Sequence, residues 1–301
     1  MIQDQTKIAH LVMFAFSVIV AGSFISGAII ANEVDPVALS TMRFFIAFWF
    51  LLLVLLFTKQ NLQGIRVRPW RYLILGSLIS LYFVLMLEGL KTASAVNMTA
   101  VMTLTPFIVV FLDFFLNKKL VTMTIFCSLV IGAIGAIWII FDADLKNLLS
   151  FKIGYGESLF LIGCISFALY TILCSKLTLT ESNLEQSTIT MIFSATLLML
   201  FEHKAILEVQ WLTLSLKMWA IILYLSFFAT AGAFLIIQYS VKLISGTQVM
   251  AYYYLVPMWV LIWDILIIGN NFRLELLLGC IAIISTFIII YSKELTFKSE
   301  S

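Results

Sequence analysis

Long apolar runs recur along the whole of this sequence, and they constrain its fold more than any other feature. A run of about 20 apolar residues is long enough to cross the hydrocarbon core of a bilayer as a helix. Ten such runs can be traced, at residues 10–31, 36–58, 70–90, 93–116, 121–141, 154–176, 184–203, 218–241, 245–269 and 273–292. The sequence therefore predicts an all-α integral membrane protein with ten transmembrane helices.

The scarcity of charge excludes a water-soluble globular protein. Only 11% of the 301 residues are charged, whereas about a quarter are charged in typical soluble domains. The net charge is only +2, and the positively charged residues lie in short connections between the runs rather than in one patch. We therefore expect no nucleic-acid partner. We expect the lipid bilayer and a small-molecule substrate as partners, and the sequence leaves a homodimer open.

Residue types typical of catalytic and metal sites are scarce in the apolar runs. The two histidines, His10 and His203, lie near the ends of runs, and the four cysteines show no Cys-x-x-Cys spacing. The sequence contains neither a His-Glu-x-x-His nor a Gly-x-Ser-x-Gly motif. We therefore expect no enzyme activity, no cofactor and no bound metal.

Two of the apolar runs contain a proline and an aspartate at the same spacing. Pro106 and Pro257 each lie inside a run, and Asp113 and Asp264 each follow seven residues later. The two prolines are 151 residues apart, and so are the two aspartates. Because proline removes a backbone donor and kinks a helix, the match predicts kinked helices at Pro106 and Pro257, at equivalent places in a duplicated unit.

Further matches extend the duplication to five runs in each half. Residues 40–43 resemble residues 187–190, and residues 131–134 resemble residues 278–281, both at an offset of 147. We interpret residues 1–148 as a first five-helix repeat and residues 149–301 as a second. Because five is odd, the second repeat would be inverted in the membrane relative to the first, an arrangement typical of secondary transporters.

The distribution of positive charge predicts an orientation. With ten spans both termini lie on one side, and the connections on that side carry eleven basic residues against six on the other. Positive residues favour the cytoplasmic side of a membrane. We therefore expect a multi-pass protein of the cytoplasmic membrane with both termini in the cytoplasm.

Several short motifs occur in a characteristic order along the chain. They are Gly22-Ser23-Phe24, Asp35-Pro36 followed by Arg43-Phe44, Gly89-Leu90-Lys91-Thr92-Ala93-Ser94-Ala95, and the two helices with Pro106 and Pro257. In these features the chain resembles the drug/metabolite transporter superfamily, EamA type. The resemblance implies transport of small metabolites across the cytoplasmic membrane, commonly export, with amino acids and related compounds as frequent cargo.

The chain departs from the family pattern at the ends of the fourth and ninth runs. Where the family often has Gly-Glu-Lys/Arg-Leu, this sequence reads Asn117-Lys118-Lys119-Leu120 and Gly269-Asn270-Asn271-Phe272. Neither segment contains an acid, so no role of those acids carries over to this chain.

Polar residues within the runs are the candidates for a substrate site. The residues that we expect to bind substrate are Ser26, Arg43, Asn97, Tyr170, Gln238, Gln248 and Tyr252. Polar groups at the amino ends of helices suit carboxylate or carbonyl groups on a small ligand. The alternative for each residue is a hydrogen bond between neighbouring helices.

Arg43 is expected to lie about two turns into the second run, on the outer side of the membrane. A charge at such depth usually faces a cavity or a partner. We expect Arg43 to face the central cavity and to pair with Glu88, Asp264 or an anionic group of the substrate. The alternative is that its side chain reaches the outer headgroups or pairs with Glu33 or Asp35.

Asp113 and Asp264 would lie toward opposite faces of the membrane if the repeats are inverted. We interpret these two residues and Glu88 as gating or coupling residues, with proton uptake by an aspartate when closure desolvates it. The alternative is solvation at the interface, with Asp113 beside Lys118 or Lys119.

The sequence thus favours a secondary active transporter that moves a small organic metabolite by alternating access. Export follows from the resemblance, and H⁺ is the expected coupling ion if one is used. The alternatives are a uniporter, facilitator or channel, or an importer. A membrane-embedded enzyme and a structural subunit are less favoured.

Overall fold

The computed structural model describes residues 2–60, 62, 68–118, 122–141, 143–149, 153–177, 181–244, 246–269 and 274–299. Over these residues the chain is helical and has no strand. Nine of the described helices are long and apolar enough to cross a membrane, and Leu274–Ile290 forms a shorter apolar helix in the place of the tenth predicted span. The prediction of an all-α membrane protein is confirmed.

The described residues of the first half form seven α-helices. They are α1 (Ile2–Ile30), α2 (Pro36–Phe57), α3 (Trp70–Gly89), α4 (Ala95–Thr103), α5 (Thr105–Asn117), α6 (Met123–Ile140) and the short α7 (Leu145–Leu149). Helices α4 and α5 together form the fourth span, Ala95–Leu116.

The second half begins with α8 (Tyr155–Leu177), α9 (Asn183–Phe201) and the short α10 (His203–Glu208). The eighth span consists of α11 (Leu216–Leu223), the π-helix η3 (Tyr224–Gly232) and α12 (Ala233–Ser240). The ninth consists of α13 (Gly246–Ala251), the 3₁₀-helix η4 (Tyr252–Leu255), α14 (Val256–Trp263) and the π-helix η5 (Asp264–Ile268). The last described helix is α15 (Leu277–Ser299).

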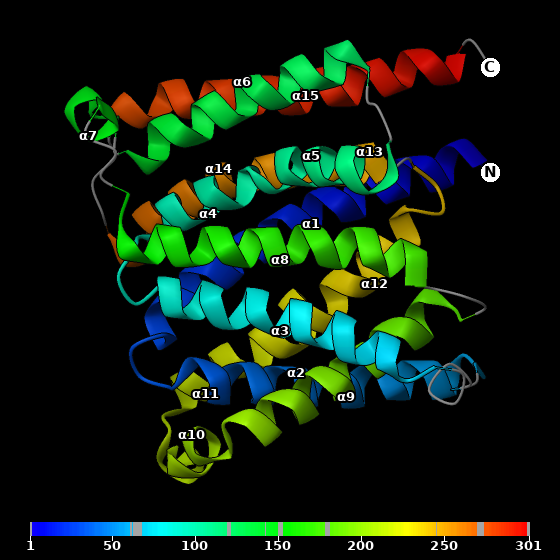
Figure 1. The fold of residues 1–301 in the computed structure, drawn as a ribbon, viewed down its shortest axis with the longest axis vertical. Coiled ribbons are helices and arrows are strands. Elements are labelled where there is room, and N and C mark those ends of the chain that lie inside the picture. Colours follow the sequence, from blue (N-terminus) through cyan, green and yellow to red (C-terminus); the bar gives the residue numbers. More distant parts are fainter. Residues whose placement is uncertain are drawn as a thin grey trace.

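The long helices run in one direction and back, so that they form a single bundle (Figure 1). The N- and C-terminal ends both lie at the same end of this bundle, on the right in Figure 1, and α7 and α10 lie at the other. We call the first the terminal end and the second the far end. Helices α2, α8 and α11 begin at the far end, and α3 and α9 begin at the terminal end (Figure 1).

Short polar side chains determine where several of these helices begin. Asp35 Oδ1 accepts two backbone N–H groups of the first turn of α2, at 2.8 and 3.1 Å, and Pro36 occupies the first turn itself. Ser94 and Ser182 accept the N–H three residues on, at the starts of α4 and α9. These side chains satisfy backbone donors that a helix leaves unpaired at its amino end.

The fourth and ninth spans are interrupted beside their prolines. Helix α4 ends at Thr103, and α5 begins at Thr105 with Pro106 in its first turn. In the ninth span η4 gives way to α14, whose first turn contains Pro257. Because proline cannot donate to the preceding turn, the regular hydrogen-bond ladder breaks at both places.

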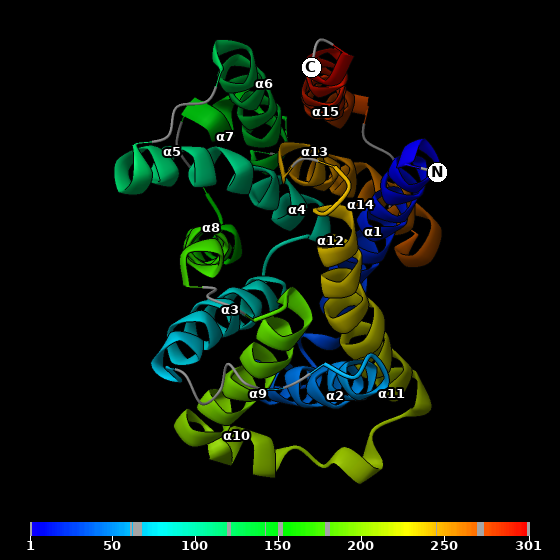
Figure 2. The ribbon, with the colours of Figure 1, turned by 90° about the vertical axis from the view of Figure 1, so that its right-hand side faces the viewer.

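The most extensive helix packing joins the first half of the chain to the second. Helix α2 packs on α9, and α6 packs on α15. Helix α3 packs on α8, and η3 and α12 both pack on α1. The end-on view shows these elements around the bundle (Figure 2).

Candidate substrate cavity

A cavity of about 330 Å³ lies within the bundle, in the size range of small-molecule sites. Its walls come from α1, α2, α3, α8, α9, η3, α12 and the first part of the ninth span. Among the described lining residues, eight are aromatic and one, Arg43, is charged. At one extreme the lining includes Asn183, the first residue of α9 at the terminal end of the bundle.

The lining of this cavity repeats itself between the two halves of the chain. Three lining positions on α1 match three on α8 at an offset of 147, namely Val20 with Phe167, Ser23 with Tyr170 and Phe24 with Thr171. Three on α3 match three on α12 at an offset of 151, namely Tyr82 with Ala233, Phe83 with Phe234 and Met86 with Ile237. Both offsets are those of the sequence duplication.

Arg43 breaks this equivalence, because a threonine, Thr190, occupies the position 147 residues later. Arg43 is the eighth residue of α2, about 10 Å from the far-end start of that helix at 1.5 Å per residue. Its side chain is 1% exposed. It is therefore buried inside the bundle, and it contributes to the cavity wall.

Neutral groups hold the Arg43 guanidinium. Its Nε donates a hydrogen bond to Thr230 Oγ1, and one terminal nitrogen, Nη2, donates to the Ala229 carbonyl at 3.2 Å. The guanidinium carbon lies 4.1 Å from the centroid of the Phe83 ring, in cation–π geometry. The second terminal nitrogen, Nη1, is buried without a hydrogen-bond partner among the described residues.

Two of the carboxylates considered as partners of Arg43 have other contacts. Glu88 Oε2 pairs with Lys91 Nζ at 2.7 Å, and Asp35 caps α2. Asp264 is the first residue of η5 in the ninth span. Over the residues that the structure describes, Arg43 forms no ion pair.

Of the other predicted binding residues, Tyr170 lines the cavity and is buried. Asn97 is buried and donates through Nδ2 to Glu157 Oε1 at 3.1 Å. Tyr252 is buried, and its hydroxyl lies 3.0 Å from His10 Nδ1. Because these contacts turn Asn97 toward α8 and Tyr252 toward α1, neither residue is part of the described cavity wall.

The remaining three predicted residues are placed as follows. Ser26 is half-buried on α1, and Ser23, three residues earlier, lines the cavity in its stead. Gln248 is buried in α13 but is not part of the wall. Gln238 belongs to α12, and its side chain lies outside the described residues.

Asp113 and Asp264 each lie beyond the break in their span, in α5 and η5, and both are half-buried. Neither contributes to the cavity wall, and the same holds for Glu88. Lys119, one of the two lysines considered as partners of Asp113, lies outside the described residues.

Sequence reasoning missed several residues that the structure brings to the cavity. Gln186 in the first turns of α9 lines the wall, as do Phe83 and Phe167. Gln186 could have been predicted to line the cavity, because it is a polar side chain near the end of a span. The aromatic residues gave none, because aromatic side chains are 14% of the chain and occur in most runs.

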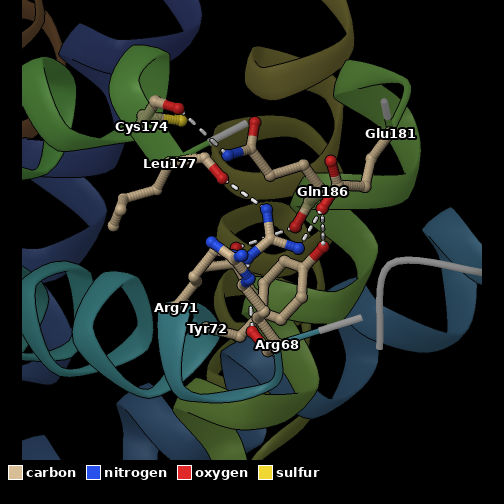
Figure 3. A network of polar contacts seen from close by, with 8 residues as sticks. Arg68, Arg71, Tyr72, Cys174, Leu177, Glu181 and Gln186 are labelled. Atoms are coloured by element: carbon tan, nitrogen blue, oxygen red, sulfur yellow. Dashed lines mark hydrogen bonds and ion pairs between the residues drawn. The ribbon is translucent and has the colours of Figure 1, made fainter. Parts of the chain in front are cut away.

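A polar network lies beside the cavity at the terminal end of the bundle (Figure 3). Arg71 Nη2 pairs with Glu181 Oε1 at 2.5 Å, and the Tyr72 hydroxyl donates to the same oxygen at 2.9 Å. Arg71 also donates to the Leu177 carbonyl. Gln186 Nε2 donates to the Cys174 carbonyl at 3.2 Å, so the network adjoins two residues of the cavity wall.

The two ends of the bundle differ at equivalent positions. At the far end a β-carbon added to Gly27 would lie 2.8 Å from Leu90 Cδ1, and Leu90 is 4% exposed. The positions that match Gly27 and Leu90 in the second half are Cys174 and Val241. Both line the cavity, and Val241 is 40% exposed. The cavity lining therefore reaches these positions at the terminal end but not the equivalent positions at the far end.

Comparison with known proteins agrees with this architecture. The model of the EamA-like transporter family matches residues 7–141 and again residues 154–292. The uncharacterized transporter YyaM of Bacillus subtilis (strain 168) is 22% identical over 277 residues, which cover 91% of this chain and 90% of that protein. A crystal structure of another protein matches 95% of this chain and 97% of its own with a TM-score of 0.71 at 13% identity, a likeness of fold alone.

The two family matches together cover most of the chain. They class the protein with membrane transporters rather than with enzymes. The chain belongs to the EamA-like transporter family.

Proposed function

We propose that this protein is a secondary active transporter that carries a small organic metabolite across the cytoplasmic membrane by alternating access. Residues 1–148 and 149–301 act as two inverted copies of one five-helix unit. The terminal end faces the cytoplasm, and the direction is export, as is common in the family. The cargo is an amino acid or a related compound.

The paired cavity wall supports the inverted repeat. When two copies of a unit face each other, equivalent positions of both copies line the shared site. The pairs on α1 and α8, and those on α3 and α12, have this relation. The family model also matches the chain twice, with its two starting points 147 residues apart.

The observation that carries the proposal is the difference between Leu90 and Val241. Equivalent positions in two copies of one unit are expected to have similar packing unless the two units are caught in different states. Leu90 is packed against Gly27 at the far end, whereas Val241 borders the open cavity at the terminal end. Exchange of these two arrangements would expose the cavity to the other side of the membrane.

A reciprocal accessibility experiment tests this exchange without knowledge of the substrate. The four native cysteines are replaced, and Leu90→Cys or Val241→Cys is introduced for reaction with a membrane-impermeant maleimide. We expect the cysteine at position 241 to react from the terminal-end side and the one at position 90 to be protected. Adding Gly27→Leu places a side chain where residue 90 packs and so displaces that residue. The cysteine at position 90 should then react, and the one at position 241 should be protected.

The control is Gly163→Ala, because a β-carbon there meets neighbours only at 3.4 Å, ordinary contact distance. It should leave both reactivities unchanged. Simultaneous reactivity at positions 90 and 241, from opposite sides, would instead indicate a channel. Counterflow of labelled substrate in liposomes, with and without a pH gradient, separates an H⁺-coupled carrier from a facilitator.

A further inference from the structure

We propose that the cavity selects organic anions, with Arg43 as the group that attracts a single acidic group and the aromatic walls holding an apolar body. The inference rests on the proposed transport function. Among amino acids and related compounds, it favours the related carboxylic acids that lack the amine. The preferred ligand is a small monocarboxylate with an aromatic or apolar body, rather than an amine or a quaternary cation.

The charge balance of the cavity is the first support. Over its described lining residues, Arg43 is the single charged side chain, and no aspartate or glutamate contributes to the wall. A charge interacts over several ångströms in a buried site because little water is present to screen it. The field of Arg43 therefore favours an anion and disfavours a cation throughout the cavity.

The hydrogen bonding of Arg43 is the second support. A guanidinium carries five N–H donors in a planar fork that matches the two oxygens of a carboxylate. Nε and one hydrogen of Nη2 are used by Thr230 and Ala229, and Nη1 has no partner among the described residues. The edge formed by Nη1 and Nη2 keeps donors for an acidic group.

The elements that hold Arg43 explain how it can stay ready for a ligand. Ala229 and Thr230 belong to η3, and a π-helix often marks a functional position in a helix. Its Ala229 carbonyl accepts from Arg43, and the Phe83 ring covers one face of the guanidinium. These neutral contacts orient the positive charge and leave it uncompensated by a carboxylate.

The aromatic wall defines the rest of the ligand. Phe16, Phe24 and Phe83 face the cavity from the first half of the chain, and Phe167 and Phe234 from the second. Burial of an apolar body against such rings is favourable, and no acid in the described lining is placed to bind an ammonium group. A zwitterion would therefore gain little from its amine.

A matched series of probes tests the inference on the purified full-length protein. The probes are 3-phenylpropionate, its neutral amide, 3-phenylpropylamine and phenylalanine, and the readout is the shift of the thermal unfolding temperature with probe concentration. We expect 3-phenylpropionate to bind at least tenfold more tightly than the amide, and the amine to bind most weakly. Chloride at the same concentrations should give no comparable shift.

Arg43→Gln should reduce the preference for carboxylate over amide to less than threefold, while Arg43→Lys should keep part of it. The matched control is Arg71→Lys, which alters a buried arginine outside the cavity wall and should leave the preference unchanged. If Arg43→Gln does not fold, the wild-type series and Arg43→Lys still decide the question.

Four results would overturn the inference. They are tightest binding of the amine, tighter binding of phenylalanine than of 3-phenylpropionate, an equal response to chloride, or an unchanged carboxylate preference in Arg43→Gln. The proposed transport function fails separately. Selective carboxylate binding without counterflow would contradict transport alone, and counterflow of amines would contradict the substrate class alone.

Discussion

At the scale of single residues, the ion pair between Arg71 and Glu181 is the strongest buried electrostatic contact that the structure describes outside the cavity wall. Both side chains are 3% exposed, and Tyr72 donates to the same carboxylate (Figure 3). The pair joins the start of α3 to the residues that precede α9. Removal of one partner would leave the other charge buried without compensation, which is far more costly than loss of the attraction itself.

We therefore expect Glu181→Gln to lower the stability of the purified protein by about 3 kcal/mol or more, as for other broken buried pairs. Thermal unfolding in detergent measures the loss. Glu208→Gln, on the exposed face of α10, is the matched control and should change stability by less than about 0.5 kcal/mol. Equal stability of the two variants would show that Arg71 does not depend on this carboxylate.

At the scale of elements, α6 and α15 form a close helix contact between the two halves of the chain. A β-carbon at Gly135 would lie 2.7 Å from the Gly279 carbonyl oxygen, and one at Gly279 would lie 2.7 Å from that of Gly135. Small residues let membrane helices approach to this distance, and close packing replaces the hydrophobic effect that lipid cannot supply.

Gly135→Ala should thus push α6 and α15 apart and destabilise the protein by about 1–3 kcal/mol, the usual range for overpacking. Gly163→Ala is the matched comparison, because its added methyl meets neighbours at 3.4 Å and alanine is the better helix former. It should be neutral or slightly stabilising in the same thermal unfolding assay. A neutral Gly135→Ala would mean that the two helices can separate freely.

At the scale of the whole molecule, the two ends of the bundle carry different parts of the chain. Both termini and the starts of α3 and α9 lie at the terminal end, and α7 and α10 lie at the far end (Figure 1). The excess of basic residues in the connections at the terminal end favours a cytoplasmic position for it. The opening of the cavity toward that end would then face the cytoplasm.

Single cysteines in the full-length, otherwise cysteine-free protein test this orientation. Glu208→Cys, at the far end, should react with an impermeant maleimide in intact cells. Thr58→Cys, exposed at the end of α2, should react only in inverted membrane vesicles. The opposite pattern would place the cavity opening outside the cell and would make uptake the more natural direction.

Much of this architecture could be predicted from the sequence. Length and apolarity determine which segments can cross a bilayer, so the spans were predictable. Local chemistry determined the helix starts at Asp35 and Ser182 and the interruptions beside Pro106 and Pro257.

The tertiary structure alone decided which polar side chains meet. Asn97 contacts Glu157 rather than the cavity, and the Arg43 guanidinium is held by Thr230, 187 residues away. A membrane helix is apolar on nearly all sides, so its sequence carries little signal of which face turns toward which neighbour. The rotation of each helix about its axis is determined by how all the helices pack together. This rotation in turn determines which side chains line the cavity.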